Sequence, residues 1–222
     1  MGISDTASLN FTTDVVPSSY VPGQAEIDLG AGYGKLIYPV NVDGNWYYYW
    51  DRSGDGSNAG VDTITHDALD AIFKYASDFT TINPAYATGN TAADDTNDTY
   101  RYAALNGVKL ALPTQGDGQT VTGISSGYYV PGTAVGGAPA SVGSTVTNSA
   151  YNDLLAIWDA YNGTGGDAGV PLYGVPSGWY DYNYYWSATP SASGHSGVYL
   201  RGGGVFDNYD TYDNSYVALE VL

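Results

Sequence analysis

The sequence predicts one α+β domain, with strands toward both ends of the chain and two helices between them. β-branched and aromatic residues alternate over residues 35–50 and again in the C-terminal third, and apolar residues recur at helical spacing in two places. Gly makes up 30 of the 222 residues, and Glu occurs only at Glu26 and Glu220, so the 23 acidic residues are nearly all Asp, which favours turns. We therefore expect a loop-rich fold with a mostly antiparallel, twisted sheet.

The first 34 residues are polar and interrupted by Gly and Pro. They contain short candidate strands at Leu9–Thr13 and Ala25–Leu29. We expect residues 1–34 to be a leader, or the edge of a preceding domain, that packs on a main domain of residues 35–222.

The main domain begins with a predicted β-hairpin. Lys35–Val42 and Trp46–Trp50 are rich in β-branched and aromatic residues, and Asp43-Gly44 between them is typical of a type I′ turn.

Two helices are expected in the middle of the chain. Thr65 is a suitable N-cap for a helix that continues to Tyr75, and Ser149 is a suitable N-cap for a second helix that ends at Asn162-Gly163. Each carries one apolar stripe at helical spacing: Leu69, Ile72, Phe73 and Ala76 in the first, and Tyr151, Leu154, Leu155, Trp158 and Tyr161 in the second.

Residues 76–148 are mostly Gly, Thr, Ser, Ala and Asp and predict a long, loop-rich insertion, with one apolar segment at Val108–Thr114. Strand patterning returns after Trp179. The expected strands are Tyr185–Thr189, Gly197–Arg201, Val205–Asp207 and Tyr216–Leu222.

Charge and composition exclude several functions. The formal net charge is −17, which repels phosphate backbones and anionic membrane surfaces, so we expect no nucleic-acid partner. The absence of Cys excludes disulfides, thiolate metal sites and a cysteine nucleophile. No apolar run approaches the roughly 20 residues of a membrane helix, and the chain begins without a signal-peptide pattern. We expect no direct membrane insertion.

One segment predicts a calcium loop. Asp51, Ser53, Asp55 and Asp62 occupy loop positions 1, 3, 5 and 12, with Gly56 at the sharp turn, as in an EF-hand loop. Asp at the twelfth position and Ser at the third would weaken the affinity, and no entering helix is expected. The alternative is an ordinary acidic loop. Any bound Ca²⁺ would be structural, and no cofactor is required.

Catalytic motifs are weak in this sequence. Gly123–Gly127 matches G-x-S-x-G, but its flanks do not predict the strand and helix which that motif needs. His66 and His195 lack zinc-site spacing, so we interpret His66 as a polar residue in the first turn of its helix and place His195 in a Gly/Ser turn. We expect no catalytic residues.

Tyrosine is concentrated at the C-terminus. Eight of the 23 Tyr residues lie between residues 180 and 216, interleaved with Asp, Asn, Ser and Gly. This is the composition of an antibody-like binding surface, in which Tyr supplies contact area and small polar residues adapt their hydrogen bonds. The alternative is that Tyr simply favours half-buried strands.

The chain carries a family likeness in four segments: Leu110–Thr114, Leu154–Gly163, Tyr185–Pro190 and Tyr216–Leu222. In this order they resemble the variable proteins of diversity-generating retroelements. These proteins have a C-type lectin-type fold and are related to the phage major tropism determinant and to the formylglycine-generating-enzyme fold. In that family, a reverse transcriptase rewrites adenines near the 3′ end of the gene.

The resemblance implies a rigid scaffold, held by Trp179 and Trp186, that displays a variable region over about residues 179–216. The expected ligand-binding residues are Tyr180, Asp181, Tyr182, Asn183, Tyr184, Ser196, Tyr199, Arg201, Phe206, Asn208, Tyr209, Thr211, Tyr212 and Asn214.

We therefore expect a non-enzymatic receptor-type protein that binds a protein ligand, with a glycan as the alternative. The localisation stays open, and surface display or an extracellular location, as part of a longer protein, is favoured. Two other interpretations stay open: an enzyme on the same fold, either glycan-processing or oxygen-dependent, and a fixed surface module that calcium stabilises.

Overall fold

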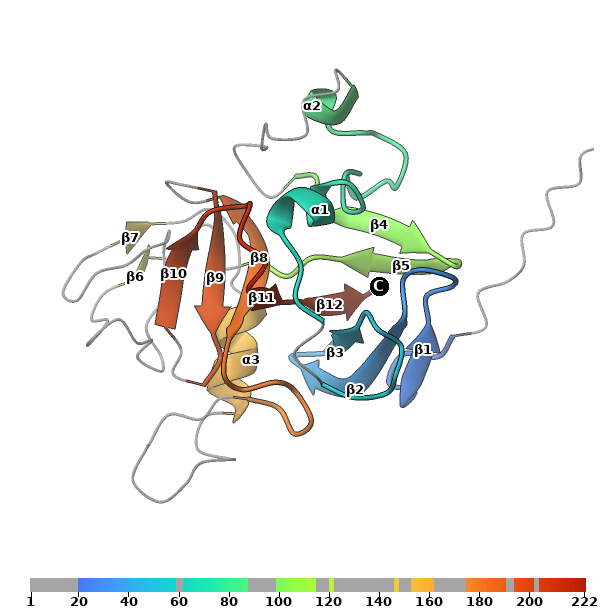
Figure 1. Ribbon diagram of the computed structural model, residues 1–222, viewed down its shortest axis with the longest axis vertical. Helices are drawn as coiled ribbons and strands as arrows, with labels where there is room; N and C mark the ends of the chain where they lie inside the picture. Colours follow the sequence, from blue (N-terminus) through green and yellow to red (C-terminus); the bar gives the residue numbers. More distant parts are fainter. Residues whose placement is uncertain are drawn as a thin grey trace, which may run out of the picture.

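Strands from both ends of the chain build the main sheet. In the computed structural model (Figure 1), β2 (Lys35–Val42) and β3 (Asn45–Asp51) form an antiparallel hairpin, and β12 (Ala218–Val221) pairs with β3. The structure describes residues 20–58, 62–87, 99–114, 120–121, 146–147, 153–161, 175–190, 194–201 and 204–222.

This sheet has six strands in the order β1-β2-β3-β12-β5-β4. β1 (Glu26–Asp28) adds to β2, while β5 (Val108–Ala111) pairs with β12 and β4 (Tyr102–Leu105) with β5, all antiparallel. Figure 1 shows the C-terminal strand between the blue N-terminal hairpin and the green hairpin from the middle of the chain. The central strand of the sheet is thus the last to be synthesised.

Two hairpins carry the expected turn chemistry. Asp43 and Gly44 both have positive φ, 53° and 93°, as a type I′ turn requires, so the predicted hairpin is confirmed. Asn106 and Gly107 repeat this, with φ of 48° and 78°, between β4 and β5. The second hairpin corrects the prediction of a loop-rich insertion over residues 76–148, because part of that range belongs to the main sheet.

A second sheet is formed almost entirely by the C-terminal third. Its order is β10-β9-β8-β11, from β8 (Tyr184–Pro190), β9 (His195–Tyr199), β10 (Gly204–Asn208) and β11 (Ser215–Tyr216). β8, β9 and β10 are antiparallel, and β11 runs parallel to β8. A separate pair, β6 (Thr120–Val121) and β7 (Val146–Thr147), completes a sheet-dominated α+β fold.

The helices are short. α1 spans His66–Asp70, α2 spans Pro84–Ala87 and α3 spans Asp153–Tyr161. Thr65 caps α1 by accepting a hydrogen bond from the Ala68 N–H at 3.2 Å, as predicted. Within the described ranges, no helix has both the length and the apolar character to cross a bilayer.

α1 ends earlier than the predicted Tyr75. The Phe73 N–H still bonds to the Leu69 carbonyl, but Tyr75 forms bridges with Ile82 and Tyr102, so the chain there is extended. α3 confirms the second predicted helix. Several expected features lie outside the described residues: the strand at Leu9–Thr13, the motif at Gly123–Gly127, Ser149, Tyr151 and the stop at Asn162-Gly163.

Two clusters of buried side chains hold the sheets and helices together. In one, Leu154, Ile157 and Trp158 of α3 pack with residues of both sheets, among them Tyr49 and Val198. In the other, Leu69 of α1 and Phe73 just after it pack with residues of both sheets, among them Trp50, Trp186 and Leu219.

The chain that forms the second sheet is fixed to the main sheet at both ends. At its start, the indole N–H of Trp179 donates to the Tyr38 carbonyl at 2.8 Å, beside Gly178. Gly178 has φ of +89°, and a Cβ there would lie 2.7 Å from the Tyr38 ring. At its end, the Trp50 N–H donates to the Val217 carbonyl at 3.1 Å.

Candidate functional site

One face of the second sheet carries clustered aromatic rings. The Tyr184 ring centroid lies 4.7 Å from that of Phe206 and 5.7 Å from that of Tyr199, so the three rings span β8, β9 and β10. Gly197 lies beneath them, because a Cβ there would be 3.3 Å from the Tyr184 Cβ. The opposite face of the sheet presents Tyr185 and the other apolar residues that pack in the α3 cluster.

Exposed aromatic side chains continue on the connections beside this sheet. Tyr182, before β8, is 66% exposed, and the Arg201 guanidinium lies 4.6 Å above its ring. Tyr209 and Tyr212, after β10, are 53% and 47% exposed and have ring centroids 5.2 Å apart. We call the six residues Tyr182, Tyr184, Tyr199, Phe206, Tyr209 and Tyr212 the aromatic face.

The other predicted ligand-binding residues are less available. Tyr180 is half-buried, with its ring 4.5 Å from that of Tyr216. Asn183 and Asn214 are also half-buried and accept hydrogen bonds from their own neighbours in sequence. Asp181 is partly exposed and Thr211 is exposed.

Two predicted surface positions are buried, which corrects the sequence analysis. Ser196 is 0% exposed, because even-numbered residues of β9 face the α3 side, like Val198. Asn208 is 8% exposed, because it pairs with His195 at the end of the sheet that α1 covers. Neither side chain can reach a macromolecular ligand in this arrangement.

That covered end holds both histidines of the chain. The His66 and His195 rings stack with centroids 3.4 Å apart and planes 9° apart, and each residue is 1% exposed. His195 Nδ1 lies 2.9 Å from Asp210 Oδ1, and His66 Nε2 lies 3.0 Å from the Ser187 carbonyl oxygen. We call His66, His195, Asp70 and Asp210 the histidine cluster. It corrects the interpretation of His66 as a simple polar residue and places His195 in β9 and not in a turn.

The two imidazoles differ in their affinity for a proton. Burial opposes charge on His66, but the Asp70 carboxylate, whose Oδ1 lies 3.1 Å from Nδ1, raises the pKa of His66 above its ordinary value. Burial and the neighbouring His66 together lower the pKa of His195. Burial alone would raise the pKa of Asp210, but the hydrogen bond from His195 lowers it. As the pH falls, His66 is therefore protonated before His195.

His66, His195 and Asp210 have ligand atoms within 4.8 Å of one another, which is close enough to suggest a metal site. The ring orientation argues against it. Imidazole lone pairs lie in the ring plane, and a metal ligand nitrogen lies about 2.0–2.1 Å from its ion. Two parallel rings 3.4 Å apart direct their lone pairs in parallel planes, so they do not converge on one ion without reorientation. In this geometry the two imidazole rings are stacked, and His195 is hydrogen-bonded to Asp210.

The predicted calcium loop is closed by hydrogen bonds of its own. The Asp51 carboxylate accepts from the Ser53 hydroxyl and from the N–H groups of Gly54 and Gly56, at 2.7–2.9 Å. Asp62 accepts from the Ser53 N–H at 3.1 Å. Asp55 accepts from the Ser57 N–H at 2.8 Å and is exposed. Asp51, Ser53 and Asp62 are thus brought together, while an ion would need Asp55 to turn inward, and the calcium site stays a prediction.

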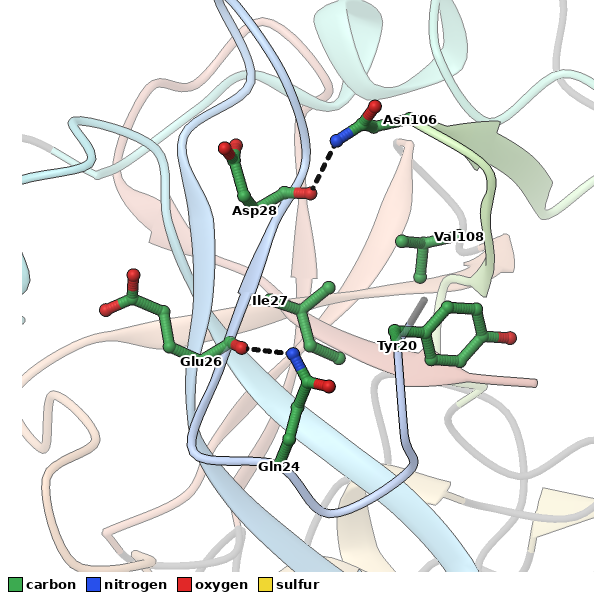
Figure 2. A pocket seen from close by; sticks show the side chains of 7 residues that line it. All are labelled: Tyr20, Gln24, Glu26, Ile27, Asp28, Asn106 and Val108. Carbon is green, nitrogen blue, oxygen red and sulfur yellow. Dashed lines mark hydrogen bonds between the residues drawn. The ribbon is translucent and has the colours of Figure 1, made fainter. Parts of the chain in front are cut away.

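A shallow pocket lies far along the chain from the aromatic face. Figure 2 shows its lining, from β1 and the turn between β4 and β5, with a volume of about 290 Å³. The Asn106 side-chain N–H donates to the Asp28 carbonyl at 3.1 Å, which ties the two edges of the main sheet together. Its floor is made by buried Ile27 and Val108. None of the predicted site residues line it, and we assign it a structural role.

No protein-family model, curated protein or solved structure matches the chain.

Proposed function

We propose that the protein is a non-enzymatic binding protein that recognises a protein ligand with the aromatic face. Among the described residues, six aromatic side chains are exposed, and four of them lie between residues 182 and 212. Exposed aromatic rings lose apolar surface to water on binding and fix few rotatable bonds, so they are efficient contact residues. This concentration of exposed rings on the second sheet and its adjoining connections is the observation that carries the proposal.

The charge around the aromatic face indicates the kind of partner. Asp181 and Asp213 are at least partly exposed there, and the single Arg of residues 180–216, Arg201, is stacked on Tyr182. Carboxylates next to tyrosine rings attract Lys and Arg side chains, through ion pairs and through contact with the ring faces. We infer that the ligand is a protein surface with basic or neutral character.

We also propose a C-type lectin-type fold and diversification by a retroelement. The mostly antiparallel sheets, the α1 and α3 helices and the long connections support the first. The second is supported by the residue types at the exposed positions, Tyr, Phe, Thr and Asp, because replacing adenines in AAY codons, as in that family, yields these residues. Buried Trp179 and Trp186 fit the scaffold role.

An acid–base role for His195 and Asp210 is less well supported. Their hydrogen bond has the geometry of a catalytic pair. However, His195 is 1% exposed and stacked on His66, so a substrate has no access to it in this arrangement.

Sequencing the 3′ end of the gene across a population of the source tests diversification. We expect differences concentrated at the codons for residues 180–215, all at adenines of a nearby template copy. An invariant segment with no such template would overturn this part of the proposal.

Binding is tested with ligands selected against the purified chain from a displayed protein library. Replacing Tyr199, Tyr209 and Tyr212 together with Ala should abolish binding of most selected ligands. Tyr33→Ala is the matched control, because Tyr33 is exposed on the turn after β1 and lies outside the aromatic face. Unchanged binding by the triple variant would refute the proposed site. If the chain bound glycans in a parallel array and no protein from the library, the ligand would be a glycan and not a protein.

A further inference from the structure

The histidine cluster and the rings of Tyr184, Tyr199 and Phe206 occupy two ends of one sheet face. His195, Gly197 and Tyr199 alternate along β9, and they pair in register with Asn208, Phe206 and Gly204 of β10. The Tyr199 and Phe206 end is open to solvent, and the His195 end is covered by α1. A change at the buried end is therefore one strand length from Tyr199, and it lies next to Tyr209 and Tyr212, which follow Asn208.

Asp210 connects the histidine cluster to the turn that carries Tyr209 and Tyr212. Its carboxylate accepts from His195, and its carbonyl accepts from the Asp67 N–H at 3.3 Å. The turn itself is closed by the Tyr212 N–H, which donates to the Tyr209 carbonyl at 2.9 Å. Gly194 permits this close approach, because a Cβ there would lie 2.6 Å from Asp210 Oδ1.

We propose that the histidine cluster makes ligand binding pH-dependent, by seating the Tyr209–Tyr212 turn when it holds one imidazolium and releasing it when a second proton arrives. The effect on ligand binding rests on the proposed function, but the pH-dependent position of the Tyr209–Tyr212 turn is a property of the free protein. A second proton places two imidazolium rings 3.4 Å apart in a buried site. Their repulsion opposes the stacking that holds α1 over β9, and with it the Asp67–Asp210 bond.

The ionisable groups that face the pair come from three elements. Asp67 and Asp70 lie on α1, Asp210 lies after β10, and Tyr86 of α2 feels both α1 carboxylates. Burial and then Asp210 raise the pKa of Asp67, and burial raises the pKa of Tyr86 to about 12, so the phenol stays neutral near neutral pH. The three carboxylates retain one imidazolium, and the second proton is opposed by burial and by His66.

The direction of the pH effect follows from the two shifts. The pKa of His195 is lowered on folding, so its contribution to stability is complete above about 6.5, the ordinary His value, and falls as pH drops. The pKa of His66 is raised, so its contribution is complete below about 6.5 and is lost as pH rises through its folded value. The turn is therefore seated best near neutral pH and loosens on acidification.

Nuclear magnetic resonance of the tag-free protein tests this without a ligand, because the chain has only two histidines to assign. We expect His66 to titrate above about 6.5 and His195 below it. The hydrogen-exchange protection of the Asp67 and Tyr212 amides should fall between pH 7 and 5. If folding lowers the pKa of His195 by one, this protection should fall about tenfold. The Trp50 amide, bonded to Val217 in the main sheet, is the control and should not change.

His195→Gln gives the matched variant, because a Gln side chain still donates to Asp210 but does not titrate. Its Asp67 and Tyr212 protection should not fall from pH 7 to 5. Titration of both histidines together near the ordinary value, or protection in the natural chain that ignores pH, would overturn the proposal.

The link to binding is tested separately, with ligands selected at pH 7. The natural chain should bind them more weakly at pH 5, and His195→Gln should retain its pH 7 affinity at both values. Equal binding by the natural chain at both pH values would overturn the link. The alanine variants of the aromatic face, measured at pH 7 only, test the proposed function independently of this result.

Discussion

Tyrosine has opposite roles in the two sheets. Tyr47, Tyr48 and Tyr49 of β3 are at most 1% exposed, whereas Tyr182, Tyr209 and Tyr212 beside the second sheet are among the most exposed aromatic residues in the described chain. The same residue type thus forms part of the core in one region and part of the surface in the other.

The difference lies in what the hydroxyl groups contact. Each buried Tyr donates to a defined acceptor: Tyr47 to Asp153 at 3.1 Å, Tyr48 to the Gln24 carbonyl at 3.1 Å and Tyr49 to Asp62 at 2.9 Å. Burial, together with Asp153 near Tyr47 and with Tyr185 and Asp62 near Tyr49, raises the pKa of these two phenols. A buried phenol needs such a partner, and an exposed one uses water until a ligand replaces it.

The largest effect is expected from removing a buried ring. Tyr49→Ala should destabilise the protein by about 3 to 5 kcal/mol, because it leaves a cavity between Tyr185 and Tyr216. Tyr49→Phe keeps the ring and should cost about 1 to 3 kcal/mol, since Asp62 loses a hydrogen-bond donor while buried. Urea unfolding measures both. A loss below that of Tyr33→Ala would show that β3 is not the core described above.

A smaller effect is expected from the acid that lies near the buried Tyr47. Burial, and then Asp153, raises the pKa of Glu220 from 4.5 to about 6, although Arg101 lies 3.8 Å away. The folded chain therefore binds a proton more tightly between these values, and this contribution to stability is lost as pH rises through about 6. Glu220→Gln should stabilise the protein by about 1 to 2 kcal/mol at pH 7 and by little at pH 4.

Unfolding free energies at the two pH values check this prediction. Glu26→Gln is the control, because Glu26 is exposed on β1 and paired with Lys35 at 2.9 Å. Equal effects of both substitutions at pH 7 would contradict a buried ionisation at Glu220.

The smallest effect on stability is expected at the aromatic face. Tyr209→Ala and Tyr212→Ala should each change the free energy of unfolding by no more than about 0.5 kcal/mol, as for other surface substitutions. Combined in one variant, the two substitutions should lower ligand affinity at least tenfold. Thermal unfolding and a binding titration on the same samples separate the two outcomes, and a large loss of stability would place these rings in the core.

The fold could be predicted where one short segment contains all the residues that determine its structure. The Asp43-Gly44 turn, the Thr65 cap and the α3 stripe all lie within single segments, and the structure has the expected hairpin, cap and helix. The β4–β5 hairpin was missed although Asn106-Gly107 is the same kind of turn signal, because the polar composition around it favoured a loop. The first helix was predicted too long, because the bridges from Tyr75 to Ile82 and Tyr102 depend on distant chain.

The site divides in the same way. Alternation and residue type predicted the exposed positions of the aromatic face, but Ser196 and Asn208 are buried. Ser196 shares the inward face of β9 with Val198, and Asn208 lies at the strand end that α1, from far away in the sequence, covers. The stacking of His66 on His195 had no local signal. That these are the chain's only two histidines was visible in the sequence, but their contact requires the assembled fold.

The anchoring of Trp179 to Tyr38 and of Val217 to Trp50 has a consequence for engineering. Because both ends of the intervening segment are held on the same sheet, the entropy of closing that loop is set by the scaffold and changes only slowly with its length. The connections that carry Tyr182 and Tyr209–Tyr212 should therefore tolerate exchange and insertion, provided that the buried strand residues between the anchors, such as Tyr185, Trp186 and Val198, are kept. A library of foreign segments in these connections, with Gly178 kept, would use the protein as a framework for new binding specificities.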